Sequence, residues 1–396
     1  MSKEKESVTF TFLAAHLSVR YRQRGARRDL DESVILNREA LDLRPPGHRH
    51  RPIYLNNLAA DLFTRYTWFG DPQDRDAAIV LDREVLNLEP QGHGDWPMSL
   101  NNLAIHLSTQ YTHHGVMQDL DEAIVLCREA LGLGPEGDLC RSISLHNLAV
   151  HLSIRYRQLG AMQDLDEAII LVRESLKLCP RRHPNRSLPL INLAAHLFSR
   201  YLNLRNMQDL HEAISLDQEA LELRPPGHPD RSTFLTIFAS HLSARYKQLG
   251  VIQDLHEAVL LDREALHLHP HGHPNRSMSL NNLVYHLSNR HAYLGAIEDL
   301  DEAILLSRDA LDLCPQGQPD RSRCLNNLAR SLRTRFTWSR HSRDKEELFS
   351  LYAQLPANVP QVVTSHDLYV AREWTGVAED FQHPATSRIR NRFSNA

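Results

Sequence analysis

Hydrophobic residues along the chain recur at the spacing of an α-helix, and a second series of polar residues recurs with them. In the segment NNLAIHLSTQY, Leu103 and Leu107 lie four residues apart and predict one buried helix face. A polar series at the same four-residue steps consists of Asn102, His106 and Gln110. Since residues four apart lie on one side of a helix, this helix is predicted to carry a buried apolar face and a separate polar face.

The same pattern returns every 45 residues. Aspartates keep this interval at Asp29, Asp74, Asp119, Asp164, Asp209, Asp254, Asp299 and Asp344. Leucines keep it at Leu17, Leu62, Leu107, Leu152, Leu197, Leu242, Leu287 and Leu332. Prolines keep it at Pro45, Pro90, Pro135, Pro180, Pro225, Pro270 and Pro315. No insertion breaks the register over eight units, so the chain is predicted to be a repeat array.

Each unit is predicted to form two helices. In the third unit the first helix runs from about Met98 to Tyr111, and Gly115 marks its end. The second helix begins at Asp119, a good N-cap residue, and Pro135 ends it, because proline cannot continue a helix. A single hairpin of this kind cannot bury its own apolar face, so neighbouring hairpins must stack.

The spacing within the unit resembles the tetratricopeptide repeat, although the period alone would also suit HEAT-type repeats. In the second helix the matching positions are Ala123, Cys127, Ala130 and Pro135. In the first helix they are Ala104, Leu107, Ser108 and Tyr111. The phrase Leu-Asn-Asn-Leu-Ala, which begins at Leu55, Leu100 and Leu325 and returns with a final valine at Leu280, is similar to repeats of kinesin light chain. The resemblance implies an all-α fold, a right-handed solenoid of about eight antiparallel helix hairpins.

The repeat array is predicted to cover residues 1–356, with a degenerate last unit. A linker and one further helix, about His366–Asp380, are predicted within 357–386, and residues 387–396 are predicted to be disordered. The C-terminal segment carries Ala371, Arg372, Trp374, His383 and Pro384. It resembles the segment that joins 45-residue fungal arrays to a caspase-like CHAT domain. No cysteine follows Cys324, so the catalytic cysteine of that domain has no counterpart here.

The resemblance implies that the first helices line a concave surface and that the polar series contacts a partner there. The candidate partner-binding residues are Asn57, Arg65, Asn102, His106, Asn147, His151, Arg155, Asn192, His196, Arg200, His241, Arg245, Asn282, His286, Arg290 and Asn327. Asparagine can pair with a peptide backbone and arginine with carboxylates, so we expect an extended, acidic protein segment or a helix as the partner. If the histidines face such a ligand, the affinity for that ligand should rise as the pH falls from about 7.5 to 6.

Other roles for this series remain open at this stage. The asparagines would equally bridge neighbouring helices, and the histidines and arginines would equally cover a solvated face. A local run, His267, His269, His271 and His273, is the best candidate for a metal ion, but no cysteine or carboxylate joins it and we predict no metal site.

The composition of the chain excludes several classes of function. The chain has 45 Lys and Arg against 49 Asp and Glu, a net charge of −4, so neither nucleic acid nor a membrane surface is an expected partner. The polar beginning of the sequence predicts a cytoplasmic or nuclear protein without a signal peptide. The five cysteines form no CxxC pair and are expected to be free thiols. There is no phosphate-binding loop, GxSxG or HExxH motif, so we predict no enzyme activity, no catalytic residue and no cofactor.

The sequence therefore favours a non-catalytic scaffold or adaptor that binds a peptide or helix in a concave groove. The alternatives are the recognition part of a CHAT protease that lacks its catalytic domain and a spacer with an empty groove. Self-association through the uncapped first helix is also compatible with the pattern.

Overall fold

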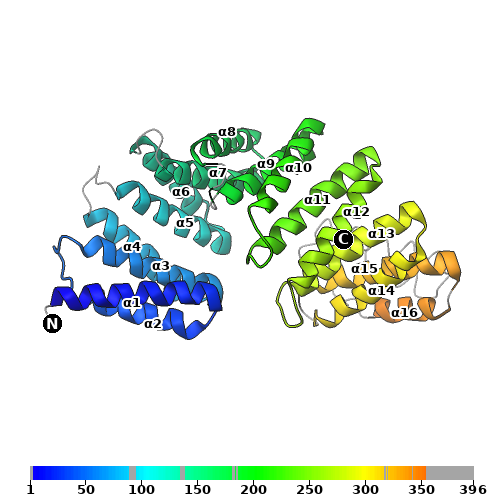
Figure 1. Cartoon of the computed structure of the whole chain (residues 1–396), viewed down its shortest axis with the longest axis horizontal. Helices are drawn as coiled ribbons and strands as arrows, with labels where there is room; N and C mark the ends of the chain where they lie inside the picture. The colour runs from blue at the N-terminus through cyan, green and yellow to red at the C-terminus, as the bar shows by residue number, and fades with distance from the viewer. Residues whose placement is uncertain are drawn as a thin grey trace. The chain divides into compact units, whose positions relative to one another are not determined.

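The computed structural model describes residues 3–88, 95–133, 139–180, 183, 186–315, 318, 320–340 and 342–353. In this part the chain forms sixteen α-helices and no strand (Figure 1). Their bounds are α1 Lys3–Arg24, α2 Arg27–Asp42, α3 Arg51–Phe69, α4 Pro72–Leu88, α5 Trp96–His114, α6 Met117–Leu133, α7 Leu139–Leu159, α8 Met162–Leu178, α9 Ser187–Leu204, α10 Met207–Glu222, α11 Arg231–Leu249, α12 Ile252–His267, α13 Arg276–Leu294, α14 Ile297–Asp312, α15 Arg321–Ser339 and α16 Ser342–Ala353. The predicted helix near residues 366–380, its linker and the tail lie outside the described residues.

The helices pack as consecutive pairs, so the prediction of one hairpin per 45 residues is confirmed. The chain divides into two compact units, Met1–Leu223 and Arg224–Ala396. Within the described residues, the first unit holds the five hairpins from α1 to α10 and the second holds the three from α11 to α16. None of these helices combines the length and apolar content that a membrane span requires.

A residue with left-handed backbone ends most of the first helices. At Gly115 the φ angle is 70°, and its N–H donates to the carbonyl of Tyr111 at 2.7 Å. Glycine adopts this conformation without the steric cost that a β-carbon brings, so the predicted stop at Gly115 is confirmed. In two repeats the left-handed residue is an arginine and not a glycine, because Arg205 and Arg340 occupy the same place with φ angles of 57° and 55°.

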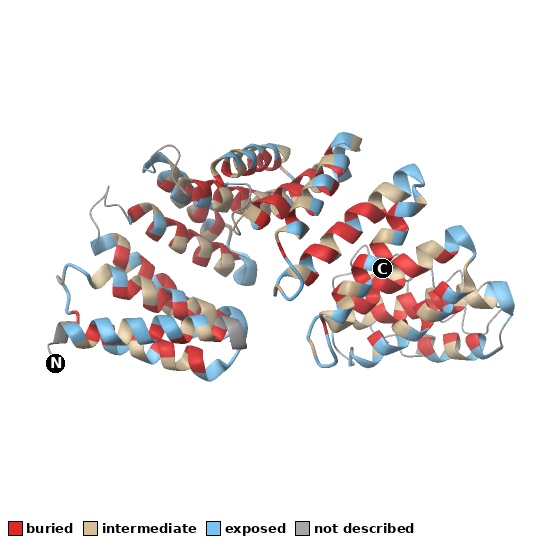
Figure 2. Cartoon of the chain, in the orientation of Figure 1, coloured by how far each residue is buried: buried red, intermediate tan, exposed pale blue. Residues whose placement is uncertain are grey.

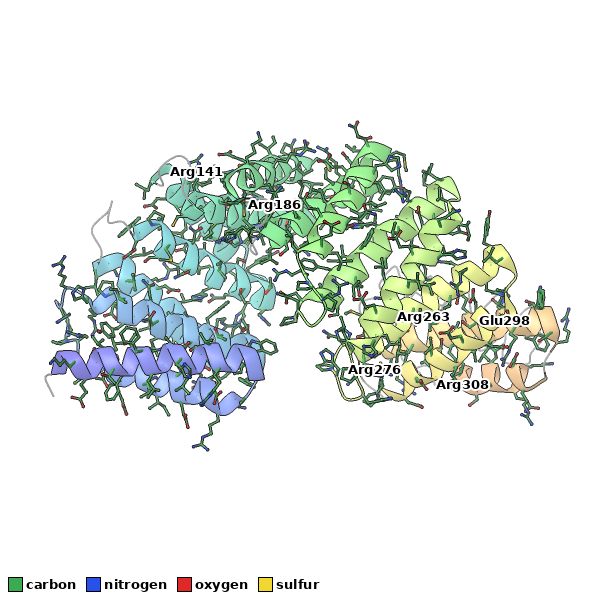
Figure 3. All side chains as sticks on the ribbon, viewed as in Figure 1. Arg141, Arg186, Arg263, Arg276, Glu298 and Arg308 are labelled. Carbon is green, nitrogen blue, oxygen red and sulfur yellow. The ribbon has the colours of Figure 1, made fainter. Side chains whose placement is uncertain are left out.

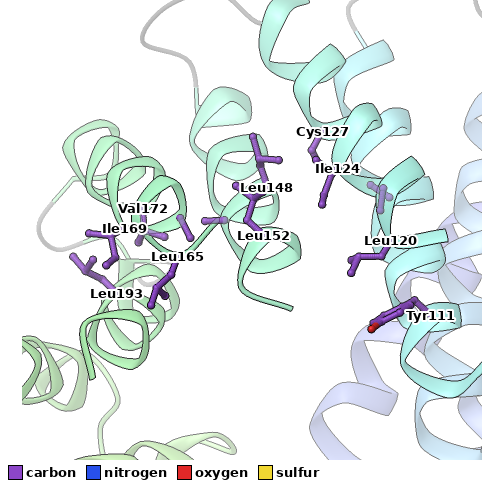
Figure 4. Close-up of a cluster of buried hydrophobic side chains, with 14 of the residues drawn as sticks. Tyr111, Leu120, Ile124, Cys127, Leu148, Leu152, Leu165, Ile169, Val172 and Leu193 are labelled. Carbon is purple, nitrogen blue, oxygen red and sulfur yellow. The ribbon is translucent and has the colours of Figure 1, made fainter. Parts of the chain in front are cut away.

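The core lies between the two helices of each hairpin and between neighbouring hairpins. In each described helix the buried residues form a stripe along one side (Figure 2). In the middle of the first unit, Leu148 and Leu152 of α7 face Ile124 and Cys127 of α6 (Figure 4). The exposed fraction of each of these four side chains is at most 2%. Burial of this kind contributes about 25 cal/mol for each Å² of apolar surface removed from water, so it dominates the stability of the stack.

Contacts between neighbouring repeats involve the first helices most. Each second helix packs on the next first helix, as α6 does on α7. The first helices also contact one another directly, α3 with α5, α5 with α7 and α7 with α9 in the first unit, and α11 with α13 and α13 with α15 in the second. In each unit the first helices therefore form a continuous face.

Ion pairs also join neighbouring repeats at the surface of the second helices. Arg263 donates to Glu302 at 2.7 Å and Arg308 to Glu347 at 2.6 Å, each 39 residues further along the chain. Figure 3 labels Arg263 and Arg308 among the side chains. These side chains are about one third to one half exposed. Exposed pairs contribute only about 0–1 kcal/mol each, so they support the stacking without determining it.

The second helices begin earlier than the sequence predicts. α6 begins at Met117 and α8 at Met162, so Asp119 and Asp164 lie in the first turn and not at the N-cap. The N-cap of α8 is Ala161, which has extended backbone and offers no side-chain cap. The prediction that these aspartates cap the helix was wrong, because the carboxylate of Asp164 binds Arg155 of the preceding helix instead.

We expect Arg205→Gly to stabilise the chain. Glycine removes the steric conflict of a β-carbon at φ 57°, and the gain of about 0.5–1 kcal/mol is partly offset by loss of the Arg205 guanidinium from the Tyr201 ring, 5.8 Å away. Thermal unfolding followed by circular dichroism measures the effect. Arg205→Ala keeps the β-carbon and should bring no gain, and equal stabilisation by both variants would contradict the explanation.

Candidate binding surface on the first helices

The sixteen candidate residues lie on the first helices, but at three different depths. They form a histidine column, an arginine column and an asparagine column, named here by residue type, each with one member in most repeats. The histidine column is His106, His151, His196, His241 and His286; the arginine column is Arg65, Arg155, Arg200, Arg245 and Arg290; the asparagine column is Asn57, Asn102, Asn147, Asn192, Asn282 and Asn327.

The histidine column is buried, which differs from the exposed polar face expected from the sequence. Its five side chains are only 2–6% exposed. Two of them bind an aspartate 24 residues earlier, on the preceding second helix. His106 Nδ1 contacts Asp82 in this way, and His286 Nδ1 lies 2.5 Å from Asp262 Oδ2. Burial raises the pKa of Asp262, and the hydrogen bond from His286 opposes that rise. These histidines therefore belong to the interior between repeats.

Two further histidines of the column have no such aspartate. The positions 24 residues before His151 and His196 hold Cys127 and Val172. Both ring nitrogens of His151, and Nε2 of His196, are buried without a hydrogen-bond partner. Burial lowers the pKa of each of these two histidines to about 4, with the neighbouring His146 adding to the effect. Neither ring gains a proton between pH 7.5 and 6, so the expected rise in affinity over that range has no source here.

The arginine column joins the two helices of a hairpin through an Arg–Asp ion pair, called the clip below. Arg155 of α7 donates two hydrogen bonds of 2.8 Å to Asp164 of α8 and a third, of 3.3 Å, to Asp121 of α6. Seven repeats contain this two-bond pair with the aspartate nine residues further on, from Arg20, Arg65, Arg155, Arg200, Arg245, Arg290 and Arg335. The paired guanidinium groups are committed to intrachain carboxylates, and a partner's carboxylate would have to compete with a bidentate pair.

The sequence contains the pattern that forms this clip, but the aspartates of the pattern are predicted from sequence to be helix caps. Arginine and aspartate recur nine residues apart in every repeat except the third, where Gln110 precedes Asp119. There Asp119 Oδ2 is buried and has no hydrogen-bond partner.

The asparagine column lies nearer the surface and is mostly half-buried. Three members bridge to the preceding first helix. Asn147 donates to Asn101 Oδ1 at 3.4 Å and Asn327 to Asn281 Oδ1 at 2.7 Å, and Asn192 Nδ2 lies 3.2 Å from His146 Nε2. These bridges fit the alternative in which asparagine joins neighbouring helices.

Asn57, Asn102 and Asn282 differ from the other three members of the column. All three are half-buried, and none of their side chains makes a hydrogen bond to another described residue. Each carboxamide has two donors and one acceptor, the set that pairs with a peptide backbone.

A cluster of donors on the second unit was not predicted from the sequence. The Lys247 ammonium and the Arg330 guanidinium lie 5.0 and 5.8 Å from the ring centre of Tyr285. Arg330 Nε and Nη2 are buried without a hydrogen-bond partner. Burial raises the pKa of Tyr285. Hydrogen bonds and the charge of Lys247 lower the pKa by a larger amount, so the net shift is downward. Two cations at one place, one of them with unused donors, can receive an anionic group.

The loop histidines do not gather around a common centre. His269 Nδ1 lies 2.7 Å from Ser279 Oγ, and its ring stacks on that of His273 at 4.2 Å. Throughout the residues that the structure describes, no group of three or more His, Cys, Asp or Glu side chains has the geometry to hold a metal ion. The five cysteines are free thiols, as expected, and all but Cys140 are buried.

The stacked hairpins and the continuous face of first helices define an all-α array of tetratricopeptide-like repeats. No family model matches the sequence, and no curated protein matches it. Among solved structures, PilF of Pseudomonas aeruginosa is 16% identical over 69% of this chain and 96% of its own, with a TM-score of 0.44.

Two further solved structures are similar at the same level. A putative kinesin light chain of Podosopora anserina with nearly identical TPR-like repeats is 19% identical, over 54% of this chain and 97% of its own, with a TM-score of 0.41. The C-terminal part of a TPR repeat-containing protein of Cytophaga hutchinsonii is 12% identical, over 82% of this chain and 99% of its own, with a TM-score of 0.46.

We expect Gln110→Arg to complete the clip in the third repeat. The new guanidinium would satisfy the buried oxygen of Asp119 and add about 1 kcal/mol to the free energy of unfolding. Chemical denaturation followed by circular dichroism measures this change. Gln110→Lys adds the same charge without the planar fork and should give a smaller gain, so an equal gain from lysine would contradict the bidentate explanation.

We expect stability to fall as the pH is lowered from about 6.5 to 4. The unfolded chain binds protons on His151 and His196 below about pH 6.5, whereas the folded chain does so only near their lowered pKa of about 4. The contribution of the neutral rings is therefore complete above pH 6.5 and is lost through this window, at about 3 kcal/mol for His151 alone. Denaturation curves over this pH range give the slope.

Two matched variants distinguish the effect of a buried histidine on the pH dependence of stability from that of an exposed histidine. His151→Leu should remove about half of the pH dependence, because His196 remains, while replacement of the exposed His256 of α12 should leave it unchanged. A slope as steep in His151→Leu as in the wild type would show that other groups cause it.

Proposed function

We propose that this protein is a non-catalytic scaffold that binds an extended peptide or a helix of a protein partner along its first helices. The observation that carries the proposal is the pair of half-buried carboxamides, Asn102 and Asn282, whose hydrogen-bonding groups are unused. Each lies on a face where neighbouring first helices contact one another. Asn147, Asn192 and Asn327, together with the arginine and histidine columns, would hold that face in shape from below.

The chemistry of the face favours a partner with acidic side chains. A carboxamide pairs with a peptide N–H and C=O, which gives affinity without selecting a sequence. On the second unit, Lys247 and Arg330 add two positive charges beside Tyr285. A carboxylate placed there would receive charge-assisted hydrogen bonds from donors that otherwise remain unpaired.

A second candidate function rests on the C-terminal sequence alone. Ala371, Arg372, Trp374, His383 and Pro384 resemble the segment that precedes CHAT domains, so the array would be the recognition part of such a protease. These residues lie outside the described part of the chain. A gene sequence that continues into a domain with catalytic histidine and cysteine would support this candidate.

We expect Asn102→Ala with Asn282→Ala to weaken partner binding at least several-fold and to leave the melting temperature nearly unchanged, because neither amide bonds within the described chain. The measurement is quantitative affinity capture on the immobilised protein at moderate salt, with circular dichroism as the folding control. The matched control replaces the exposed Gln118 and Gln253 of the second helices α6 and α12 by alanine.

The outcomes discriminate among the functions. Loss of the same bound proteins in the asparagine variant, and not in the glutamine variant, supports the scaffold. A bound set that is unchanged in both variants contradicts the proposed face, and an empty set at all salt concentrations favours a spacer.

A further inference from the structure

A small pocket opens between the first two repeats of the first unit. It has a volume of about 190 Å³, an order of magnitude more than one water needs. Its lining comes from three helices: Thr11, Ala15, Ser18 and Val19 of α1, Asn37 of α2, and Asn57, Ala60 and Asp61 of α3. Asn57 belongs to the asparagine column, so the pocket lies on the face to which the binding function is assigned.

The polar floor of the pocket consists of hydrogen-bond acceptors. The Asp61 carboxylate is 8% exposed and accepts bonds of 2.7 Å from Ser18 Oγ and from Asn37 Nδ2, with Ser33 Oγ also in contact. The Asn37 side chain is 3% exposed. Because its Nδ2 must face the carboxylate, the orientation of the amide is fixed, and the opposite one would place two oxygens against each other.

This orientation leaves one buried acceptor unused. Asn37 Oδ1 has no hydrogen-bond partner among the described residues. A buried carbonyl oxygen without a partner is destabilising, and a ligand that donates a hydrogen bond to it removes that penalty. The floor thus presents an unused acceptor next to a buried carboxylate, a combination that selects a cationic donor.

The upper walls of the pocket are apolar, and the next pair of repeats has no equivalent space because a large ring occupies it. Ala15, Val19 and Ala60 present short aliphatic side chains. One repeat later Phe63 replaces Ser18, and its ring lies 3.9 Å from that of His106, the counterpart of Asp61. The large ring fills the equivalent space and a histidine replaces the acid, so the first two repeats differ from the third in both volume and charge.

We propose that this pocket binds a primary ammonium group carried on a short aliphatic chain. The ammonium donates to Asp61 and to Asn37 Oδ1, and the aliphatic chain packs on Ala15, Val19 and Ala60. If the scaffold function holds, the natural occupant is a lysine side chain of the bound segment, and that last step alone rests on the proposed function. A lysine in this pocket would fix the register of the bound segment on the first unit.

The test uses n-butylammonium chloride as the probe on the full chain, with saturation-transfer NMR and a titration to obtain Kd. n-Butanol has the same aliphatic chain without the charge and is the matched control ligand. We expect saturable binding of n-butylammonium, no comparable binding of n-butanol, and a Kd at least about tenfold higher in Asp61→Asn, since a charge-assisted bond is replaced by a neutral one.

A second variant guards against misfolding. Asn37→Asp with Asp61→His recreates the pair that Asp82 and His106 form one repeat later, so the fold already accommodates it. This variant should keep the melting temperature of the wild type and lose the probe. Equal binding of n-butanol, or an unchanged Kd in the folded double variant, would overturn the proposal. Because the probe needs no partner, loss of protein capture by the Asn102 and Asn282 variant with retained n-butylammonium binding implicates the asparagine face alone.

Discussion

Each hairpin of this chain depends on its neighbours to bury an apolar face that it cannot bury alone. Leu62, Leu107, Leu152 and Leu197 occupy one position in successive repeats, and none is more than 1% exposed. Because the helices on either side approach closely enough to exclude water from these leucines, they also enclose the polar residue that precedes each of them. The histidine column is buried for this reason and not because of any property of histidine.

A buried polar group loses its hydrogen bonds to water. The repeats differ in whether another side chain replaces those hydrogen bonds. His286 has Asp262, whereas His151 faces Cys127 and stays neutral. In the first pair of repeats Asp61 and Asn37 take the same two positions and leave an acceptor free. Variation at these two positions, with Ser18 in place of Phe63 in the case of the pocket, thus produces an ionic contact, a neutral ring or a pocket. The backbone framework stays the same in all three cases.

The repeat period, the two helices per unit and the buried leucines could be predicted from the sequence, because each depends on spacing along one helix. The depth of the polar columns could not, since residues at four-residue steps share a helix side, and only the packing of the next helix decides whether His106 or Asn102 reaches the surface. The clip of Arg155 to Asp164 was visible as a nine-residue interval. The pocket required knowing that Ser18 and Ala60 face each other where Phe63 fills the next layer.

The most direct test of this account is the reactivity of the histidines toward diethyl pyrocarbonate, mapped by mass spectrometry on the native protein near neutral pH. The account predicts that His106, His151, His196, His241 and His286 are protected until the chain unfolds, while the exposed His211 and His256 of the second helices react at once. Modification of the five column histidines at the rate of His211 and His256 would show that water reaches them in the folded state. That result would contradict the burial of the histidine column between neighbouring repeats.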